Sequence, residues 1–278
     1  MNKQTLIEQI KKYHSFLCVG LDPDIQKIPK HLLAKPDPIF EFNCAIIDAT
    51  HQYCIAYKPN FAFYEMHGSE GIQSLEKTIS YIRTNYPDKF IIADAKRGDI
   101  GNTSEKYAYA ILKRLDCDAI TLSPYMGKDA IMPFLSYPNK WAIILAITSN
   151  EGAADFQQML CTNHKPLYQN VIEKTREWGS PENTMYVVGA THHPAIIHSA
   201  RRLIPHHFIL IPGIGTQGGD LKTISHSAFN SEIGILINVS RAILYADHHP
   251  ENFTLSAQIQ AQMYQKQMEE LLKEHRLI

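Results

Sequence analysis

Short apolar runs alternate with longer amphipathic segments along almost the whole chain. The runs have the length of buried β-strands, and the segments between them carry apolar residues at the three- and four-residue spacing of helices. Eight runs have this character: FLCVGL, CIAYKP, FIIADAK, DAITLS, WAIILAIT, MYVVGA, FILIPG and IGILINV. Helices are predicted over residues 38–53, 69–85, 103–115, 166–178, 194–204, 219–228 and 252–275.

Eight strands that alternate with helices predict an α/β protein, a (β/α)8 TIM barrel. We expect a single domain over residues 1–278, because no composition shift, low-complexity tract or long linker marks a boundary. A doubly wound sheet is the alternative, although no G-x-G-x-x-G follows the first run. The long connection over residues 150–166, after the fifth run, is of the kind that closes over a substrate.

Charge and composition exclude several classes of partner. The chain has 27 basic and 28 acidic residues and a formal net charge of -1, which predicts binding neither to nucleic acid nor to a membrane surface. The N-terminus lacks the apolar core of a signal peptide, and the longest apolar runs are too short to cross a bilayer, so we expect a cytoplasmic protein. Five scattered cysteines without a C-x-x-C pair, and histidine pairs without H-x-x-x-H spacing, argue against a disulfide framework or a metal site.

The most informative segment is FIIADAKRGDIGNTSEKYA, residues 90–108, where an apolar strand ends in charged residues. Asp94 and Lys96 are two residues apart, so on a strand they project from one face. Asn102 and Glu105 predict a helix N-cap with a capping box. In a parallel α/β protein, ligands bind where strands end.

Two further predicted strands end in charged residues at the same end of the barrel. Asp22 follows the first run, Lys58 ends the second, and Asp99 lies just beyond the third. Each residue alone would be an ordinary turn former or surface ion. Together with Asp94 and Lys96 they predict a cluster of three carboxylates and two ammonium groups.

The last two strands predict a phosphate site. PGIGTQGGD, residues 212–220, has four glycines in nine residues, which lets backbone N–H groups approach an anion closely. Arg241 follows the eighth strand at a helix start, where its charge opposes the helix dipole unless it faces an anion. The loops after strands seven and eight form the commonest phosphate site on this fold.

Several motifs carry a specific resemblance. DAKRGDIGNT has the pattern D-x-K-x-x-D-I-x-x-T, and PGIGTQGGD, KPNFAFYE and VVGATH accompany it. The chain resembles the orotidine 5'-phosphate decarboxylase family, in its longer bacterial subgroup, type 2. The segment NVSRA departs from the pattern by lacking a glycine beside the arginine, and THHP carries an additional histidine.

The resemblance implies a cofactor-independent carboxy-lyase that converts orotidine 5'-phosphate to UMP and CO2, the last step of de novo pyrimidine biosynthesis. Lys96 would protonate C6 of the pyrimidine, Asp94 would face the departing carboxylate, and Lys58 would bridge that carboxylate and the ribose. Asp99 would complete the charge network. Without a metal, pyridoxal or thiamine, such an enzyme must stabilise the developing carbanion by fixed charge alone.

The resemblance also implies the residues that bind substrate and a homodimer with shared active sites. Asp22 would bind ribose hydroxyls and Ser149 the pyrimidine. Asp99 and Thr103 would reach into the neighbouring subunit's site. The phosphate would be held by Gln217, Arg241 and the glycine loop that contains Gly215.

Three alternatives stay open. A metal-dependent phosphosugar decarboxylase or synthase of the same superfamily resembles this motif. An aldolase-like barrel would use Lys58 or Lys96 as a Schiff-base nucleophile. A catalytically silent barrel would bind nucleotides as a sensor or scaffold, since fold alone does not imply activity.

Overall fold

The computed structural model describes residues 1–215, 220–247 and 251–278. Its eight strands form one closed parallel barrel in which each strand pairs with the next along the chain and β8 pairs with β1. The strands are β1 (Leu17–Leu21), β2 (Ala56–Pro59), β3 (Phe90–Arg97), β4 (Ala119–Leu122), β5 (Trp141–Ile147), β6 (Thr184–Val188), β7 (Phe208–Pro212) and β8 (Ile235–Val239). The predicted (β/α)8 barrel is therefore confirmed, and the doubly wound sheet is wrong.

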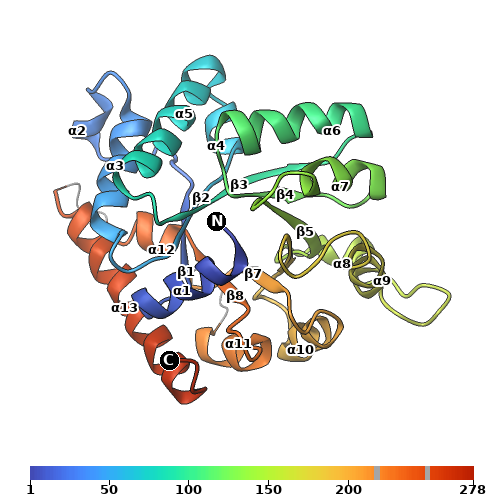
Figure 1. Cartoon of the computed structure of the whole chain (residues 1–278). Coiled ribbons are helices and arrows are strands. Elements are labelled where there is room, and N and C mark those ends of the chain that lie inside the picture. The colour runs from blue at the N-terminus through green and yellow to red at the C-terminus, as the bar shows by residue number, and fades with distance from the viewer. Residues whose placement is uncertain (216–219, 248–250) are drawn as a thin grey trace.

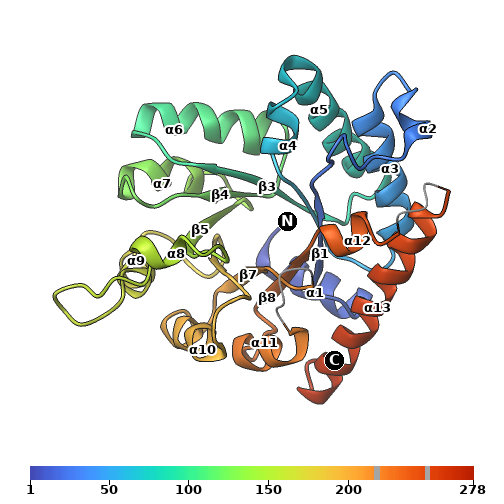
Figure 2. The ribbon, with the colours of Figure 1, turned by 180° about the vertical axis from the view of Figure 1, so that it is seen from behind.

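Helices surround the barrel on all sides, as the two end views show (Figures 1 and 2). The long helices are α1 (Lys3–Tyr13), α3 (Pro38–Thr50), α5 (Gly68–Asn85), α6 (Gly101–Ala108), α7 (Lys128–Leu135), α9 (Leu167–Thr175), α10 (Pro194–Leu203), α11 (Leu221–Ala228) and α13 (Phe253–Glu274). A π-helical segment, η1 (Tyr109–Arg114), continues α6. Short helices are α2 (Lys30–Leu33), α4 (Ala62–Glu65), α8 (Ala153–Phe156) and α12 (Arg241–Leu244). No helix among the described residues is both long and apolar enough to span a membrane.

The barrel interior is a packed core rather than a pore. At the amino ends of β3, β5 and β7, Phe90, Trp141 and Phe208 meet edge to face, with ring centroids 6.2 and 6.3 Å apart. These three strands are not neighbours in the sheet, so their side chains can only meet inside the barrel. Layers built from alternate strands are characteristic of this fold.

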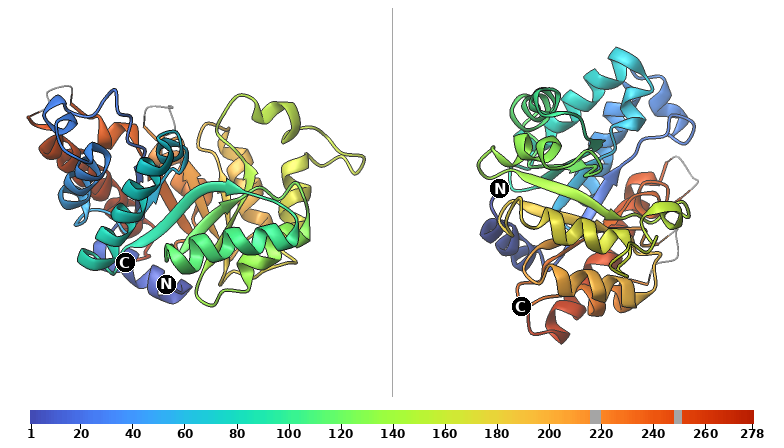
Figure 3. Two further views of the ribbon diagram at one scale, coloured as in Figure 1. Left: turned by 90° about the horizontal axis from the view of Figure 1, so that it is seen from above. Right: turned by 90° about the vertical axis from the view of Figure 1, so that its right-hand side faces the viewer.

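Two local predictions were wrong. Helix α7 was not predicted, because Pro133 lies inside it, yet its buried face of Ala130, Ile131 and Phe134 holds it against the barrel. The predicted capping box at Asn102 is not formed, since α6 begins at Gly101 and has no side-chain N-cap. The segment between α8 and α9, within the long connection after β5, projects from the body of the protein (Figure 3).

A buried arginine joins the outer helices to the amino end of the barrel. Arg201 of α10 is 6% exposed and donates to four backbone carbonyls, those of Ala228, Ile204, His207 and Gly234, at 2.7–2.8 Å. Burial lowers its pKa to about 9. The guanidinium thus satisfies carbonyls on segments that lead into β7 and β8.

Replacing this arginine should destabilise the fold. We expect Arg201→Met to lower the free energy of unfolding by about 3–5 kcal/mol, because four buried carbonyls lose their donors. Urea unfolding monitored by circular dichroism measures this, with Arg202→Met, at an exposed neighbouring position, as the matched control. Equal stability of the two variants would contradict the assignment.

Candidate active site

A cavity of about 410 Å³ lies at the carboxyl ends of the strands. All eight strands, or the loops that directly follow them, contribute to its wall. Six of the residues predicted from the sequence line it, namely Asp22, Lys58, Asp94, Lys96, Ser149 and Arg241. The topology therefore brings together residues that are more than 200 positions apart in the sequence.

The centre of the cavity is a carboxylate held between two ammonium groups. Lys58 Nζ lies 2.7 Å from Asp94 Oδ2, and Lys96 Nζ lies 2.6 Å from Asp94 Oδ1. Thr121 adds a third donor, with its hydroxyl 3.1 Å from Asp94 Oδ1. Lys58 and Asp94 are buried, whereas the side chain of Lys96 is 51% exposed and faces the open part of the cavity.

An irregularity in β3 sets the position of Lys96. The register of β3 against β4 shifts between Ala93 and Arg97, and Lys96 has a φ of 47°. This left-handed conformation is unfavourable for a residue with a side chain. Backbone strain of this kind is found most often at functional sites. The hydroxyl of Thr121 accepts the Lys96 N–H at 2.9 Å, so one side chain fixes both the backbone of the lysine and the carboxylate.

Contacts within the network keep Asp94 and Lys58 ionised. Burial opposes the charged form of Asp94, but the charges of Lys58 and Lys96 and their hydrogen bonds outweigh it and hold the pKa of the carboxyl well below its usual range. Burial likewise opposes the charge on Lys58, and the nearby carboxylates of Asp94 and Asp22 raise its pKa above the ordinary value. Both groups are therefore charged at neutral pH.

Asp22 lies on the β1 side of the same cavity. Its Oδ1 is buried and has no hydrogen-bond partner within the described chain. The loop that carries it is tied to the end of α12, because the Tyr245 hydroxyl donates to the Asp22 carbonyl at 3.0 Å and accepts from Asp24 N–H at 2.7 Å. The backbone that carries the Asp22 carboxylate is thus held in place, and Oδ1 of this carboxylate is available to accept a hydrogen bond.

The β5 side is held by the loop after β6. Thr191 donates to the Ser149 carbonyl at 2.7 Å, and the His192 ring donates from Nε2 to the Thr148 carbonyl at 2.6 Å. A Cβ on Gly189 would lie 2.6 Å from Ser149 Cα, so only glycine allows the two strand ends to come this close. Ser149 therefore lines the cavity on a backbone that is held by the end of β6 and the loop after it.

The end of the cavity beside β7 and β8 is suited to an anion. Gly213 lines it with a φ of 102°, and Arg241 follows β8 with an exposed side chain. Gly215, with a φ of 85°, lies just past this lining, where a Cβ would come within 2.8 Å of the Tyr264 hydroxyl. Gln217 lies outside the described residues.

Asp99 and Thr103 do not line the cavity of their own chain. Asp99 accepts the Ile100 N–H at 2.7 Å, just before α6, and Thr103 lies in the first turn of that helix. In this chain Asp99 makes no ion pair with Lys58 or Lys96 among the described residues. The charge cluster of one chain therefore consists of Asp22, Lys58, Asp94 and Lys96.

Sequence reasoning missed several polar residues in the wall. Thr121 and Asn238 are buried polar side chains inside otherwise apolar strands, and this contrast was the available signal. Asn60 and Ser240 directly follow strands β2 and β8. Asn60 and Ser240 lie two and one residues from the predicted Lys58 and Arg241, so for these two the register along the strand was the missing information.

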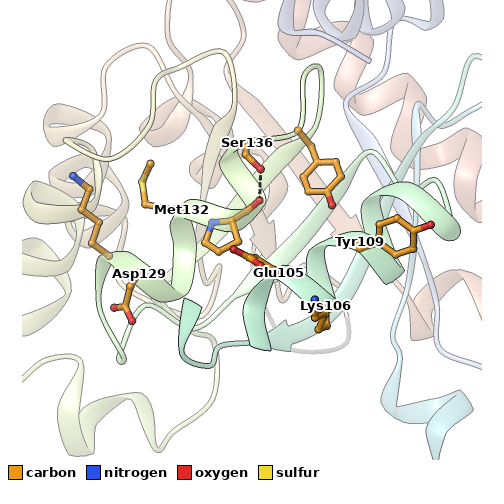
Figure 4. A pocket seen from close by; sticks show the side chains of 9 residues that line it. Glu105, Lys106, Tyr109, Asp129, Met132 and Ser136 are labelled. Atoms are coloured by element: carbon orange, nitrogen blue, oxygen red, sulfur yellow. Dashed lines mark hydrogen bonds between the residues drawn. The ribbon is translucent and has the colours of Figure 1, made fainter. Parts of the chain in front are cut away.

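A second and larger hollow, about 1130 Å³, lies on the outside of the protein between α6 and α7. Figure 4 shows Glu105 and Lys106 on α6 and Tyr109 at the start of η1, opposite Asp129 and Met132 on α7. Its charged side chains do not converge on a common point in this view. The barrel cavity, where buried charges meet, is therefore the candidate active site.

Comparison with known proteins relates the chain to one family. The sequence profile described as "Orotidine 5'-phosphate decarboxylase / HUMPS family" matches residues 15–253. Proteins named orotidine 5'-phosphate decarboxylase from Phocaeicola vulgatus and Bacteroides fragilis are 57% and 55% identical to the chain, over 98% of it and 99% of each relative. The solved structure of Leishmania donovani OMP decarboxylase has 35% identity and a TM-score of 0.79, covering 96% of this chain and 100% of the other. That of Plasmodium berghei orotidine 5'-monophosphate decarboxylase has 27% identity and a TM-score of 0.84, covering 98% of both.

The depressed pKa of Asp94 gives the cluster a defined pH dependence. In the unfolded chain this carboxyl titrates near its ordinary value of 3.8, and in the folded protein below it, so its stabilisation is present above pH 3.8 and is lost as the pH falls through the folded pKa. At pH 7 we expect Asp94→Asn to lower the free energy of unfolding by about 3–5 kcal/mol, because buried Lys58 loses its counter-ion.

Urea unfolding of wild type and Asp94→Asn at a series of pH values measures this, with exposed Asp129→Asn as the control. The wild-type advantage should be constant from about pH 8 to pH 5 and should shrink only below that range. An advantage that already shrinks between pH 8 and pH 6 would mean that Asp94 is not held ionised by the lysines.

Proposed function

Because the chain belongs to the orotidine 5'-phosphate decarboxylase / HUMPS family, we propose that it is a carboxy-lyase that converts orotidine 5'-phosphate to UMP and CO2. The observation that carries the proposal is the Lys58–Asp94–Lys96 network inside the barrel mouth. We propose that residues 1–278 form one catalytic unit, that it acts in the cytoplasm, and that it performs the last step of de novo pyrimidine biosynthesis.

Fixed charge supplies the catalysis in this proposal. As the bond between C6 and the carboxylate carbon breaks, CO2 leaves and its bonding electron pair stays on C6. The Lys96 ammonium stabilises this developing negative charge and then transfers a proton to C6. Asp94 faces the departing carboxylate and orients Lys96, and its contact with Lys58 supports a role for that lysine between the carboxylate and the ribose.

Substrate binding uses the two sides of the cavity. Ser149 hydrogen-bonds the pyrimidine, and the free acceptor of Asp22 binds a ribose hydroxyl. Arg241, with Gln217 and the loop containing Gly215, holds the phosphate. Binding energy from the remote phosphate then helps to position the base against Lys96.

We propose a homodimer in which Asp99 and Thr103 serve the neighbouring subunit's site. Their absence from the cavity of their own chain supports this. Ile100, between them in the sequence, is 52% exposed, and just before α7, which packs against α6, Tyr125 is 94% and Met126 47% exposed. An exposed apolar patch beside a functional residue is typical of an interaction site.

Contacts within the network disfavour the competing functions. Both oxygens of Asp94 accept hydrogen bonds from the protein, which disfavours a role as a metal ligand in a phosphosugar decarboxylase. The raised pKa of Lys58 makes it a poor Schiff-base nucleophile, because that role needs the neutral amine. A silent binding protein would have no need of a strained Lys96 backbone.

Turnover tests the proposed function directly. Wild-type protein should consume orotidine 5'-phosphate, seen as a loss of its ultraviolet absorbance, at a rate that exhaustive chelation leaves unchanged. Lys96→Ala should lower kcat by at least about 10³-fold, because the proton donor and its charge are both lost. Lys128→Ala, at an exposed position outside the cavity, is the matched control. Loss of activity on chelation would favour the metal-dependent alternative. Tight binding of orotidine 5'-phosphate without turnover would favour the catalytically silent barrel.

Mixing two inactive variants tests the shared site. Lys96→Ala and Asp99→Ala should each be nearly inactive alone. After subunit exchange in an equal mixture, activity should recover to roughly a quarter of wild type, since each mixed dimer contains one intact site. If Asp99 serves its own chain, no site in the mixture is intact and no activity returns.

A further inference from the structure

Asn238 is a polar side chain in an apolar strand that the proposed chemistry does not use. It lies next to the end of β8, in the sequence ILINV, and is 7% exposed. It lines the active-site cavity. Its Nδ2 donates to Ser240 Oγ at 3.3 Å, while its Oδ1 is buried and has no partner within the described chain.

The neighbouring strand makes room for this amide. Gly20 of β1 has no side chain, and a Cβ there would lie 3.3 Å from Asn238 Oδ1 and only 1.8 Å from Ser240 Oγ. β1 and β8 pair through Cys18 and Asn238, so the amide lies directly beside β1. The barrel therefore accommodates the Asn238 amide at a position where an apolar side chain of similar size would pack equally well.

A second unpartnered acceptor faces the same part of the cavity. Asp22, two residues beyond Gly20, also has a buried Oδ1 without a partner within the described chain. The two lysines in the wall, Lys58 and Lys96, both donate to Asp94 instead. Because buried acceptors without donors are unfavourable, this side of the cavity calls for a ligand that brings hydrogen-bond donors.

A sugar hydroxyl meets this requirement. It donates to a carboxylate or an amide oxygen, and it can equally accept from an amide N–H, so it satisfies Asn238 in either orientation of the amide. Asn238 lies three residues before Arg241 on the β8 side of the cavity and beside Gly20, which is two residues before Asp22. That is where the sugar would lie if Arg241 holds the phosphate.

We propose that Asn238 binds a ribose hydroxyl of the nucleotide and is a specificity-determining residue that makes the site select ribonucleotides over deoxyribonucleotides. This inference rests on the proposed function, since it takes the ligand to be a pyrimidine nucleotide. It adds a residue of β8 to the sugar site, on the wall beside Asp22.

Equilibrium binding of three nucleotides tests the assignment without turnover. UMP, 2'-deoxy-UMP and 3'-deoxy-UMP are titrated by calorimetry into wild type, Asn238→Leu and Asn238→Ala. The leucine variant keeps the volume, and the alanine variant serves if leucine does not fold. Ser225→Ala is the matched control, because the Ser225 hydroxyl is also buried without a partner within the described chain but lies on α11, outside the cavity.

Wild type should bind UMP more tightly than at least one deoxy analogue. The Asn238 variants should bind UMP about tenfold more weakly, yet bind that analogue with unchanged affinity, so the preference disappears. Ser225→Ala should match wild type throughout.

An equal loss of affinity for all three nucleotides, or an unchanged preference, would overturn the assignment. If wild type binds UMP but does not decarboxylate orotidine 5'-phosphate, the proposed function fails while these affinities still decide the role of Asn238. If wild type binds none of the nucleotides, both proposals fail.

Discussion

The candidate active site depends on one buried carboxylate that accepts from two lysines. Asp94 would be costly to bury alone, and Lys58 equally so, but together they satisfy each other's charge at 2.7 Å. The second oxygen of Asp94 then fixes the ammonium of Lys96 at the open side of the cavity. Removing the carboxylate would take away the hydrogen-bonded counter-ion of both lysines, so neither lysine's position is independent of Asp94.

The barrel supplies the rigidity that this arrangement needs. Lys58 and Asp94 come from adjacent strands, and Thr121, on the next strand, hydrogen-bonds both the carboxylate and the backbone of Lys96. The unfavourable φ of Lys96 persists because this contact and the bulge in β3 hold it. An ammonium group held in advance at the reacting carbon stabilises a carbanion without rearrangement during the reaction. The same wall holds the buried Oδ1 acceptors of Asp22 and Asn238, which have no partner among the described residues and which we propose bind the sugar.

Much of this could be predicted from the sequence, because barrel strands here are apolar runs that end abruptly in charged residues. Eight runs predicted the closed barrel, and the strand ends at Asp22, Lys58 and Asp94 predicted the cluster. The spacing of Asp94 and Lys96 suggested a shared face on a regular strand, and the two side chains do meet, although the register of β3 is irregular between Ala93 and Arg97. Helix α7 escaped prediction because Pro133 weakens the local helical signal and only tertiary packing compensates.

Other features depend on contacts that sequence spacing does not contain. The role of Thr121 follows from the register of β4 against β3, and the room for the Asn238 amide from the absence of a side chain at Gly20. Similarly, Asn102 has the residue type of an N-cap, but α6 starts one residue before it.

The most direct test of the charge network compares two ligands that differ only at C6: UMP and a uridine 5'-phosphate analogue with an anionic oxygen on that carbon. Wild type should bind the anion at least about 10²-fold more tightly, because Lys96 is held in advance where negative charge develops. Lys96→Met should lose most of this advantage while binding UMP nearly as well. If the preference for the anion is the same in both proteins, the proposed role of the Lys96 ammonium is contradicted.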